Sequence, residues 1–201
     1  MLLHRRGLSL IEVIVTVALI SIAMILVAWL FQFGVRINRS AEERNALQAD
    51  RLRLSRKLQR TLANSYRSGN TAFYMNNPVD RDDLALCIIV PESWNEDTQG
   101  AIFSGYDIYY RLASDNTLRF LHLDSAPVEV AVPLSEAEVR AAITADPGVV
   151  ILKSITLMQL YVPANGTPTD FLVNPVGLRL AQQTSRETTL TTELTLKLVS
   201  P

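Results

Sequence analysis

A single carboxylate, Glu12, lies near the start of a long apolar segment. Arg5 and Arg6 precede it, and no charged residue occurs from Val13 to Val35. This uncharged stretch exceeds the ~20 apolar residues that a helix needs to cross a bilayer core of about 30 Å. Inside such a segment a carboxylate costs on the order of 3 kcal/mol, unless it lies at the headgroup boundary or has a partner. Position alone therefore leaves two interpretations of Glu12 equally open: a carboxylate at the headgroup boundary, or one that forms an ion pair with a cation supplied from elsewhere.

The remaining chemically reactive residues form no catalytic pattern. The sequence has no G-x-S-x-G, H-E-x-x-H or Walker-type motif and no paired Cys or His ligands. His122 lies between two leucines, where a structural or surface histidine is expected rather than a general base. Cys87 is the only cysteine and lies in an apolar run, so we expect a buried thiol and no intramolecular disulfide. The protein is expected not to be an enzyme.

One loop offers a weak candidate for metal binding. Asp80, Asp82 and Asp83 supply three carboxylates, the ligand type that calcium prefers. Arg81 lies among them, however, and the spacing is not that of an EF-hand. We therefore expect no cofactor, with calcium as the one alternative.

Two groups of basic residues raise the question of nucleic-acid binding. One could form an exposed aromatic and basic patch for single-stranded DNA: Tyr109, Arg111 and Arg119. The other lies in the second, polar half of the long helix predicted below: Arg51, Arg53, Arg56, Lys57 and Arg60. Cross-strand pairing explains the first group, and a solvated helix face or contacts between subunits explain the second. With 19 basic and 20 acidic residues, the chain lacks the overall charge typical of DNA-binding proteins.

The N-terminal residues Gly7-Leu8-Ser9-Leu10-Ile11-Glu12-Val13 resemble the processing site of type IV prepilins and of the pseudopilins of type II secretion. In that family a dedicated prepilin peptidase cuts after the glycine that ends a short basic leader. The same peptidase methylates the new terminal amine. The resemblance places the cut between Gly7 and Leu8, with Leu8 N-methylated and Glu12 fifth in the mature chain. Phe is commonest in the family where this chain has Leu8.

The resemblance also implies a partner for Glu12. In the family the acid of one subunit meets the methylated amine of its neighbour in the apolar filament core. Such a pair makes a buried charge tolerable and fixes axial register. The implied partners are other pilins or pseudopilins through the N-terminal helix, the prepilin peptidase and the inner-membrane assembly platform.

Residues 1–7 are expected to be a cleaved leader and not part of the fold. By the positive-inside rule, Arg5 and Arg6 stay in the cytoplasm. This predicts a single pass through the inner membrane over Val13 to Val35, with the head outside the cytoplasm. After assembly the expected location is a pilus or pseudopilus.

The polar segment after Val35 continues the helix. From Arg36 to Tyr66 there is no Gly or Pro, and good helix formers dominate. Leucines recur on one face: Leu47, Leu54, Leu58 and Leu62. We therefore predict one helix over residues 8–66, of which 8–35 form the transmembrane and assembly part and 36–66 are amphipathic.

Residues 67–201 are predicted to form a β-rich globular head. Its strands are expected at 84–90, 106–112, 117–123, 149–162, 171–180 and 190–198. Leucines and polar residues alternate in the last of these, as in a sheet with one face on a helix. A capping box at Ser135–Glu138 predicts a short helix to about Ala145, expected to bridge two parts of the sheet. The fold class is therefore α+β: a long N-terminal helical spine packed on an antiparallel β-sheet head, the pilin fold.

The expected function is that of a minor type IV pilin-like subunit, incorporated into a pilus or pseudopilus in initiation or at the tip. Chain length and the lack of a disulfide favour a minor subunit over a major one. Pilus assembly, twitching, adhesion and DNA uptake are the roles left open. A minor pseudopilin of a type II secretion system is the alternative. An uncleaved membrane protein with a periplasmic binding domain is a more remote one.

Overall fold

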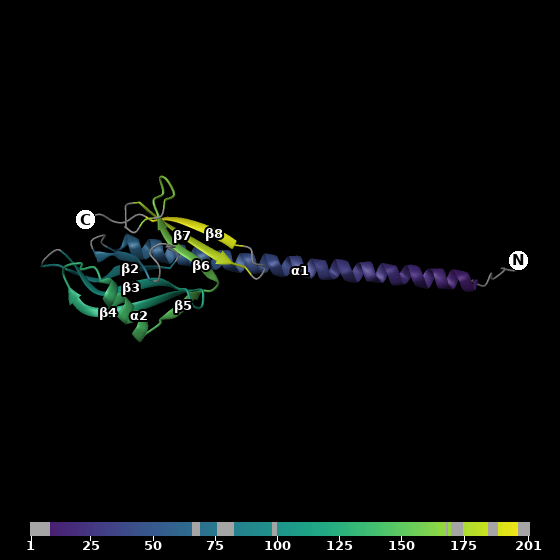
Figure 1. Ribbon diagram of the computed structural model, residues 1–201, viewed down its shortest axis with the longest axis horizontal. Helices are drawn as coiled ribbons and strands as arrows, with labels where there is room; N and C mark the ends of the chain where they lie inside the picture. Colours follow the sequence, from purple (N-terminus) through teal and green to yellow (C-terminus); the bar gives the residue numbers. More distant parts are fainter. Residues whose placement is uncertain are drawn as a thin grey trace. The chain divides into compact units, whose positions relative to one another are not determined.

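The computed structural model describes residues 9–65, 69–75, 83–97, 100–167, 169, 175–184 and 189–196. Two compact units form, Met1–Leu47 and Gln48–Pro201. A long helix, α1, is followed by the strands and the second helix of the head (Figure 1). The elements after α1 (Leu10–Ala63) are β1 (Thr71–Tyr74), β2 (Leu84–Asn95), β3 (Gly100–Leu112), β4 (Thr117–Val128), α2 (Glu136–Ala145), β5 (Val149–Leu152), β6 (Ile155–Tyr161), β7 (Val176–Gln183) and β8 (Thr189–Leu196). The predicted α+β class is confirmed.

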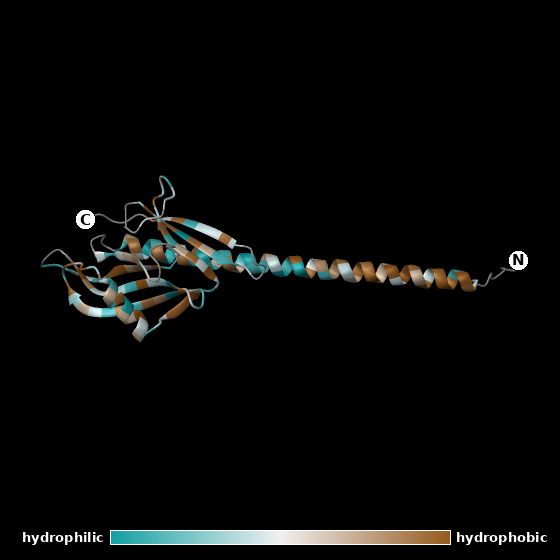
Figure 2. Cartoon of the chain, viewed as in Figure 1, coloured by the Kyte–Doolittle hydropathy of each residue, from teal (hydrophilic) through white to brown (hydrophobic). Residues whose placement is uncertain are grey.

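Helix α1 has 54 residues and ends close to the predicted position. Its first half is apolar and its second half polar, as the hydropathy colours show (Figure 2). Two hydroxyls in the apolar half are satisfied inside the helix, because Thr16 donates to the Glu12 carbonyl (2.7 Å) and Ser21 to the Val17 carbonyl (2.8 Å). These bonds remove the cost of placing a hydroxyl in an apolar segment.

The strands form two antiparallel sheets. The first has the order β1-β2-β3-β4-β5 and the second β6-β7-β8. The single strand predicted over 149–162 is therefore wrong: β5 ends at Leu152, and Ser154 takes a positive φ of 59° before β6 begins in the other sheet. Strand β1 was not predicted. The predicted residues 171–174 and 197–198 lie outside the described residues.

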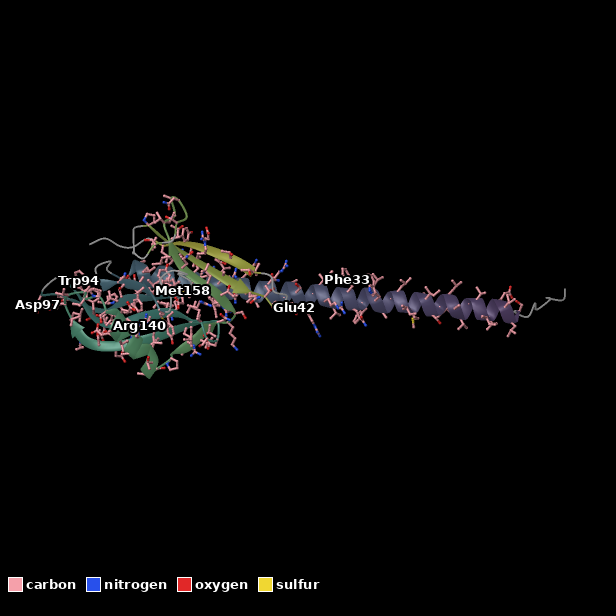
Figure 3. All side chains as sticks on the ribbon, in the orientation of Figure 1. Phe33, Glu42, Trp94, Asp97, Arg140 and Met158 are labelled. Carbon is pink, nitrogen blue, oxygen red and sulfur yellow. The ribbon has the colours of Figure 1, made fainter. Side chains whose placement is uncertain are left out.

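The core of the head lies between the two sheets and the last turns of α1. Leu54, Leu58 and Leu62 are buried there, and Leu47 is half-buried, so the predicted leucine stripe is confirmed. The same cluster takes side chains from both sheets, among them Leu86 and Met158, of which Met158 is labelled in Figure 3. One helix face thereby packs on both sheets, whose backbones are also bridged at Asp83 and Met158.

Helix α2 covers the other face of the five-stranded sheet. Its Val139 and Ile143 pack with Cys87 and Ile108, whereas the neighbouring side chains of β2 face α1. The predicted capping box is present, since Ser135 Oγ accepts from the Glu138 amide. Hydrogen bonds from Ser135 in turn hold the pKa of the Glu138 carboxyl below its usual range. The expectation that this helix bridges two parts of the sheet is wrong, because it packs on one face of one sheet.

Candidate assembly site

Glu12 lies in the first turn of α1, where it closes a capping box with Ser9. The Ser9 amide donates to Glu12 Oε2 (2.8 Å), and the Glu12 amide donates to Ser9 Oγ (3.2 Å). Two amides at the helix start thereby find acceptors. The carboxylate also faces the positive end of the helix dipole. This role was missed in the sequence analysis, although the S-x-x-E pattern that signals it is present from Ser9 to Glu12.

The surroundings of Glu12 are apolar and open. Leu10 and Ile11, which precede Glu12, are exposed, and so is Val13, which follows it. The first basic residue after Glu12 in the sequence is Arg36, several helical turns away. The carboxylate therefore has its capping partner inside the chain, while any cation for it has to come from the chain's own N-terminus or from another molecule.

The predicted processing residues, Gly7 and Leu8, lie outside the described residues. The cut between them stays a prediction, and so does methylation of Leu8. An amine on Leu8 would stand next in sequence to Ser9, one end of the capping box.

The apolar part of α1 has the length and composition of a membrane span. Its most apolar window has a mean hydropathy of 2.8, and none of that window is buried. Its exposed side chains include Trp29 and Phe33, whose rings stack at 5.7 Å between centroids; Phe33 is labelled in Figure 3. The acid thus lies at the start of a helix whose next turns expose an apolar surface. That surface needs lipid or other helices around it.

The predicted calcium loop gains no support. Asp80 and Asp82 lie outside the described residues. Asp83 is buried at the junction of the two sheets, where its backbone bridges to Met158 and its carbonyl accepts from the Met75 amide (3.0 Å). Within the described ranges, no group of three or more His, Cys, Asp or Glu side chains is placed to hold a metal ion.

The alternative of an aromatic and basic patch for DNA is wrong, and the favoured interpretation, cross-strand pairing, fits the structure. Tyr109 is 0% exposed and packs on Phe120, and its burial raises the pKa of its phenol. Arg111 is buried as well, where its Nε donates to the Ile155 carbonyl (2.8 Å). Arg119 forms an ion pair with Asp115 (2.7 Å). These side chains make their contacts inside the head, so their role is cross-strand packing.

The basic residues of α1 do not all lie on a solvated face. Arg51 is only 9% exposed, and desolvation lowers its pKa. Its guanidinium donates to Gln182 Oε1 (3.1 Å), Thr192 Oγ1 (2.6 Å) and the Leu190 carbonyl (2.8 Å). The Lys57 ammonium lies 3.4 Å from the centroid of the Phe120 ring, a cation–π contact. Solvation is confirmed for the exposed Arg53, Arg56 and Arg60.

Cys87 and His122 have the environments predicted for them. Cys87 is fully buried, and burial raises the pKa of its thiol to about 12, so the reactive thiolate is suppressed. His122 lies partly exposed between two carboxylates, with Nδ1 2.8 Å from Asp107 Oδ1 and Nε2 3.3 Å from Asp124 Oδ1. Both are explained as structural residues.

Residues 2–28 match the family model of the prokaryotic N-terminal methylation motif. The chain has the N-terminal segment of the type IV prepilin and pseudopilin family. The match includes the predicted cleavage position, the Ser9–Glu12 capping box and most of the apolar helix. It supports processing by prepilin peptidase and association with other pilins in general. No match was found among curated proteins or among solved structures.

Proposed function

We propose that this pilin-like protein is a minor subunit, incorporated in initiation or at the tip of a pilus or pseudopilus. The observation that carries the proposal is Glu12, an acid at the start of an exposed apolar helix inside a methylation motif. In a membrane anchor alone such an acid would serve only as a helix cap. The head supports a minor role because its only cysteine, Cys87, is buried, which leaves no disulfide-closed loop of the kind many pilins carry.

The mechanism is a transfer of α1 from lipid to a bundle of neighbouring pilin helices. In the bilayer the capping box satisfies Glu12 at the end of the helix. Cleavage after Gly7 gives a charged amine to Leu8, the residue that precedes Ser9 in the sequence. On assembly, the amine of one subunit meets Glu12 of the next. Charges buried together are tolerable, whereas one buried alone costs roughly 3–5 kcal/mol, so only the correct axial register is stable.

The head contributes protein surface and no chemistry in this proposal. We propose a non-enzymatic role because the groups that could do chemistry in the head, such as His122 and Arg111, are held in ion pairs and packing contacts. A minor pseudopilin of a type II secretion system uses the same N-terminal device. The two versions differ in the machine that the filament serves.

Deleting this subunit in its own host tests the proposal. An initiating subunit is needed once per filament, so we expect the number of filaments to fall strongly while the major subunit stays in the inner membrane. The restored wild-type chain should occur in sheared filaments far below the amount of the major subunit. Unchanged filament numbers, or a chain as abundant in filaments as the major subunit, would contradict a minor initiating role.

A further inference from the structure

Trp94 is a large aromatic side chain that the head leaves uncovered. Its exposed fraction is 57%, whereas Phe103 and Tyr109 of the same sheet are buried. Trp94 and Asp97 lie at the same end of the head (Figure 3). An uncovered indole offers a large apolar face to water, and such rings are typical of places where a ligand or partner binds.

A break in the register of β2 decides which way Trp94 faces. The pairing of β2 with β3 skips Glu92, after which Trp94 pairs with Ala101. Side chains alternate between the two faces of a strand, and one skipped residue exchanges the faces for every residue after it. Before the skip, the odd-numbered Cys87 and Ile89 belong to the core cluster on the α2 side of the sheet, and so does Ala101. The even-numbered Trp94 therefore faces that side, where the methyl group of its pairing partner is too small to cover an indole.

An open cavity lies beside the indole. It has a volume of about 310 Å³, at the lower end of that typical of ligand pockets. Its described lining consists of Asn64, Pro91, Glu92, Ser93, Trp94 and Ala101. An amide and a hydroxyl both donate and accept hydrogen bonds, and a carboxylate accepts them. The cavity therefore combines an aromatic face with donors and acceptors.

The local charge is negative. Residues 91–97 include three acids and no base, and the described lining of the cavity contains no Lys, Arg or His. Nucleic acids and anionic lipid surfaces are bound mainly through basic residues, so this place is unfavourable for both. The centre of a protein–protein interface is usually apolar, whereas the indole here is flanked by Glu92 and Ser93. A small uncharged polar ligand fits these surroundings better.

The strand end that carries Trp94 is held by side-chain hydrogen bonds. Asn95 Nδ2 donates to Glu129 Oε1 (2.7 Å), and the Asp97 amide donates to Asn95 Oδ1 (3.0 Å). Glu129 directly follows β4, so the end of β2 is tied to the end of another strand. A site that is fixed before its ligand arrives loses less conformational freedom on binding.

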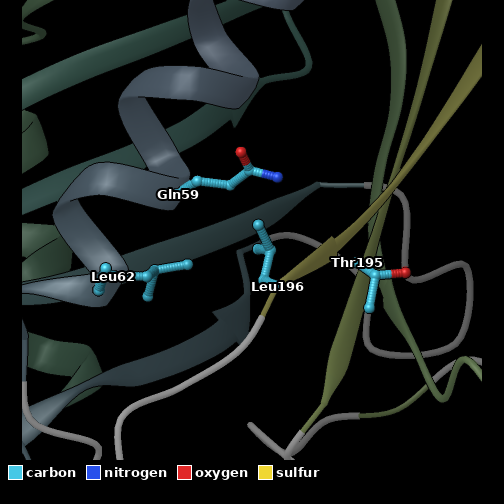
Figure 4. Close-up of a pocket in the computed structure, with 5 residues that line it drawn as sticks. Gln59, Leu62, Thr195 and Leu196 are labelled. Carbon is cyan, nitrogen blue, oxygen red and sulfur yellow. The ribbon is translucent and has the colours of Figure 1, made fainter.

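A second cavity in the head has a different lining (Figure 4). It has a volume of about 360 Å³ and lies between the last turns of α1 and β8, where Leu62 and Leu196 supply apolar surface. Figure 4 shows the Thr195 hydroxyl pointing away from Leu196, which leaves Gln59 to supply polar groups among the described lining residues. This cavity suits apolar groups, and it has no tryptophan in that lining.

We propose that the Trp94 cavity binds a neutral carbohydrate, with one flat, equatorially substituted pyranose ring stacked on the indole. The face of such a ring consists of C–H bonds, which the negative face of an aromatic system attracts. Each sugar hydroxyl both donates and accepts a hydrogen bond, and Asn64, Glu92 and Ser93 provide the matching groups. This site belongs to the head alone, so it goes beyond the proposed assembly role and can fail without it.

A fluorescence titration of the full chain tests the class of ligand. The chain carries Trp29→Phe, which leaves Trp94 as its only tryptophan, and is kept in a detergent without a sugar headgroup. The probes are cellotetraose and tetra-N-acetylchitotetraose, with the open-chain polyol sorbitol as control. We expect a saturable change with at least one tetrasaccharide below about 10 mM. The midpoint should not move in about 0.5 M NaCl, because a neutral ligand is not screened. A response to neither tetrasaccharide, an equal response to sorbitol, or a response only to tetralysine overturns the proposal.

Variants at the cavity show whether Trp94 itself carries the binding. By calorimetry with the same sugar, Trp94→Ala should weaken binding by about tenfold, the effect of losing one stacked ring, and Trp94→Phe by less. Trp94 is exposed, so an unchanged urea midpoint is expected to show that both variants fold. Glu92→Gln keeps an acceptor without the charge and should bind within about twofold of the parent. Thr195→Ala, exposed at the cavity in Figure 4, is the matched control and should bind normally. Unchanged binding by Trp94→Ala, or loss of binding by Glu92→Gln, would overturn the proposal.

Discussion

Replacing Glu12 by alanine is expected to abolish incorporation into filaments while insertion and cleavage continue. The variant helix is still apolar enough to span the membrane, and the predicted cleavage position is untouched. In the filament, however, the amine of the neighbouring subunit would be buried without its acid, at roughly 3–5 kcal/mol. The measurement is the fraction of mature chain in sheared filaments relative to the membrane.

Two further variants separate the charge of Glu12 from its capping role. Glu12→Gln keeps an acceptor for the Ser9 amide, because glutamine also closes a capping box, but removes the charge. Ser9→Ala keeps the charge and removes the hydroxyl that accepts from the Glu12 amide. We expect Glu12→Gln to fail like alanine and Ser9→Ala to assemble. The reverse pattern would show that Glu12 serves only as a cap.

Truncating Leu58 to alanine is expected to destabilise the head by about 2–5 kcal/mol. Leu58 is 0% exposed and belongs to the core cluster that includes side chains of α1 and of both sheets, so its truncation leaves a cavity in the core. Urea unfolding of the full chain in detergent micelles measures the loss. Trp94 reports on the head by fluorescence, in a background where Trp29 of the apolar helix is replaced by Phe.

Leu52→Ala is the matched control for this truncation. Leu52 lies on the same helix but is 58% exposed, so its loss should change the free energy of unfolding by no more than about 0.5 kcal/mol. Equal effects of the two substitutions would show that the leucine stripe does not join α1 to the sheets.

Local patterns predicted the helices and the final strand well. The absence of Pro and Gly after Gly34, together with the leucine stripe, predicts α1 to within a turn of its end at Ala63. The S-x-x-E pattern at Ser135 placed the start of α2, and the leucine alternation placed β8. Each of these signals lies within a few residues of the element that it predicts.

Features that depend on distant residues could not be predicted. The hydrogen-bond partners of Arg51 lie 131 to 141 residues away in the sequence, so nothing near Arg51 indicates its burial. The break between β5 and β6 falls at Ser154, which adopts a positive φ without the glycine that usually marks one. Strand β1 has only four residues and pairs with β2 through backbone bonds that any sequence can make.

At the candidate site, the capping box of Glu12 could be predicted from the sequence. Its second partner, the amine on Leu8, could not. The Ser9–Glu12 spacing predicts the capping box directly. The amine on Leu8 follows only from the resemblance to prepilins, because the physical chemistry of the residues does not show that a peptide bond will be cut.

The intact mass of the membrane form tests the central claim most directly. The full chain is produced with a prepilin peptidase and its mass is measured after extraction from the inner membrane. The account predicts a chain that begins at Leu8 and carries one added methyl group. A chain that still carries residues 1–7 in the presence of the active peptidase would contradict the account.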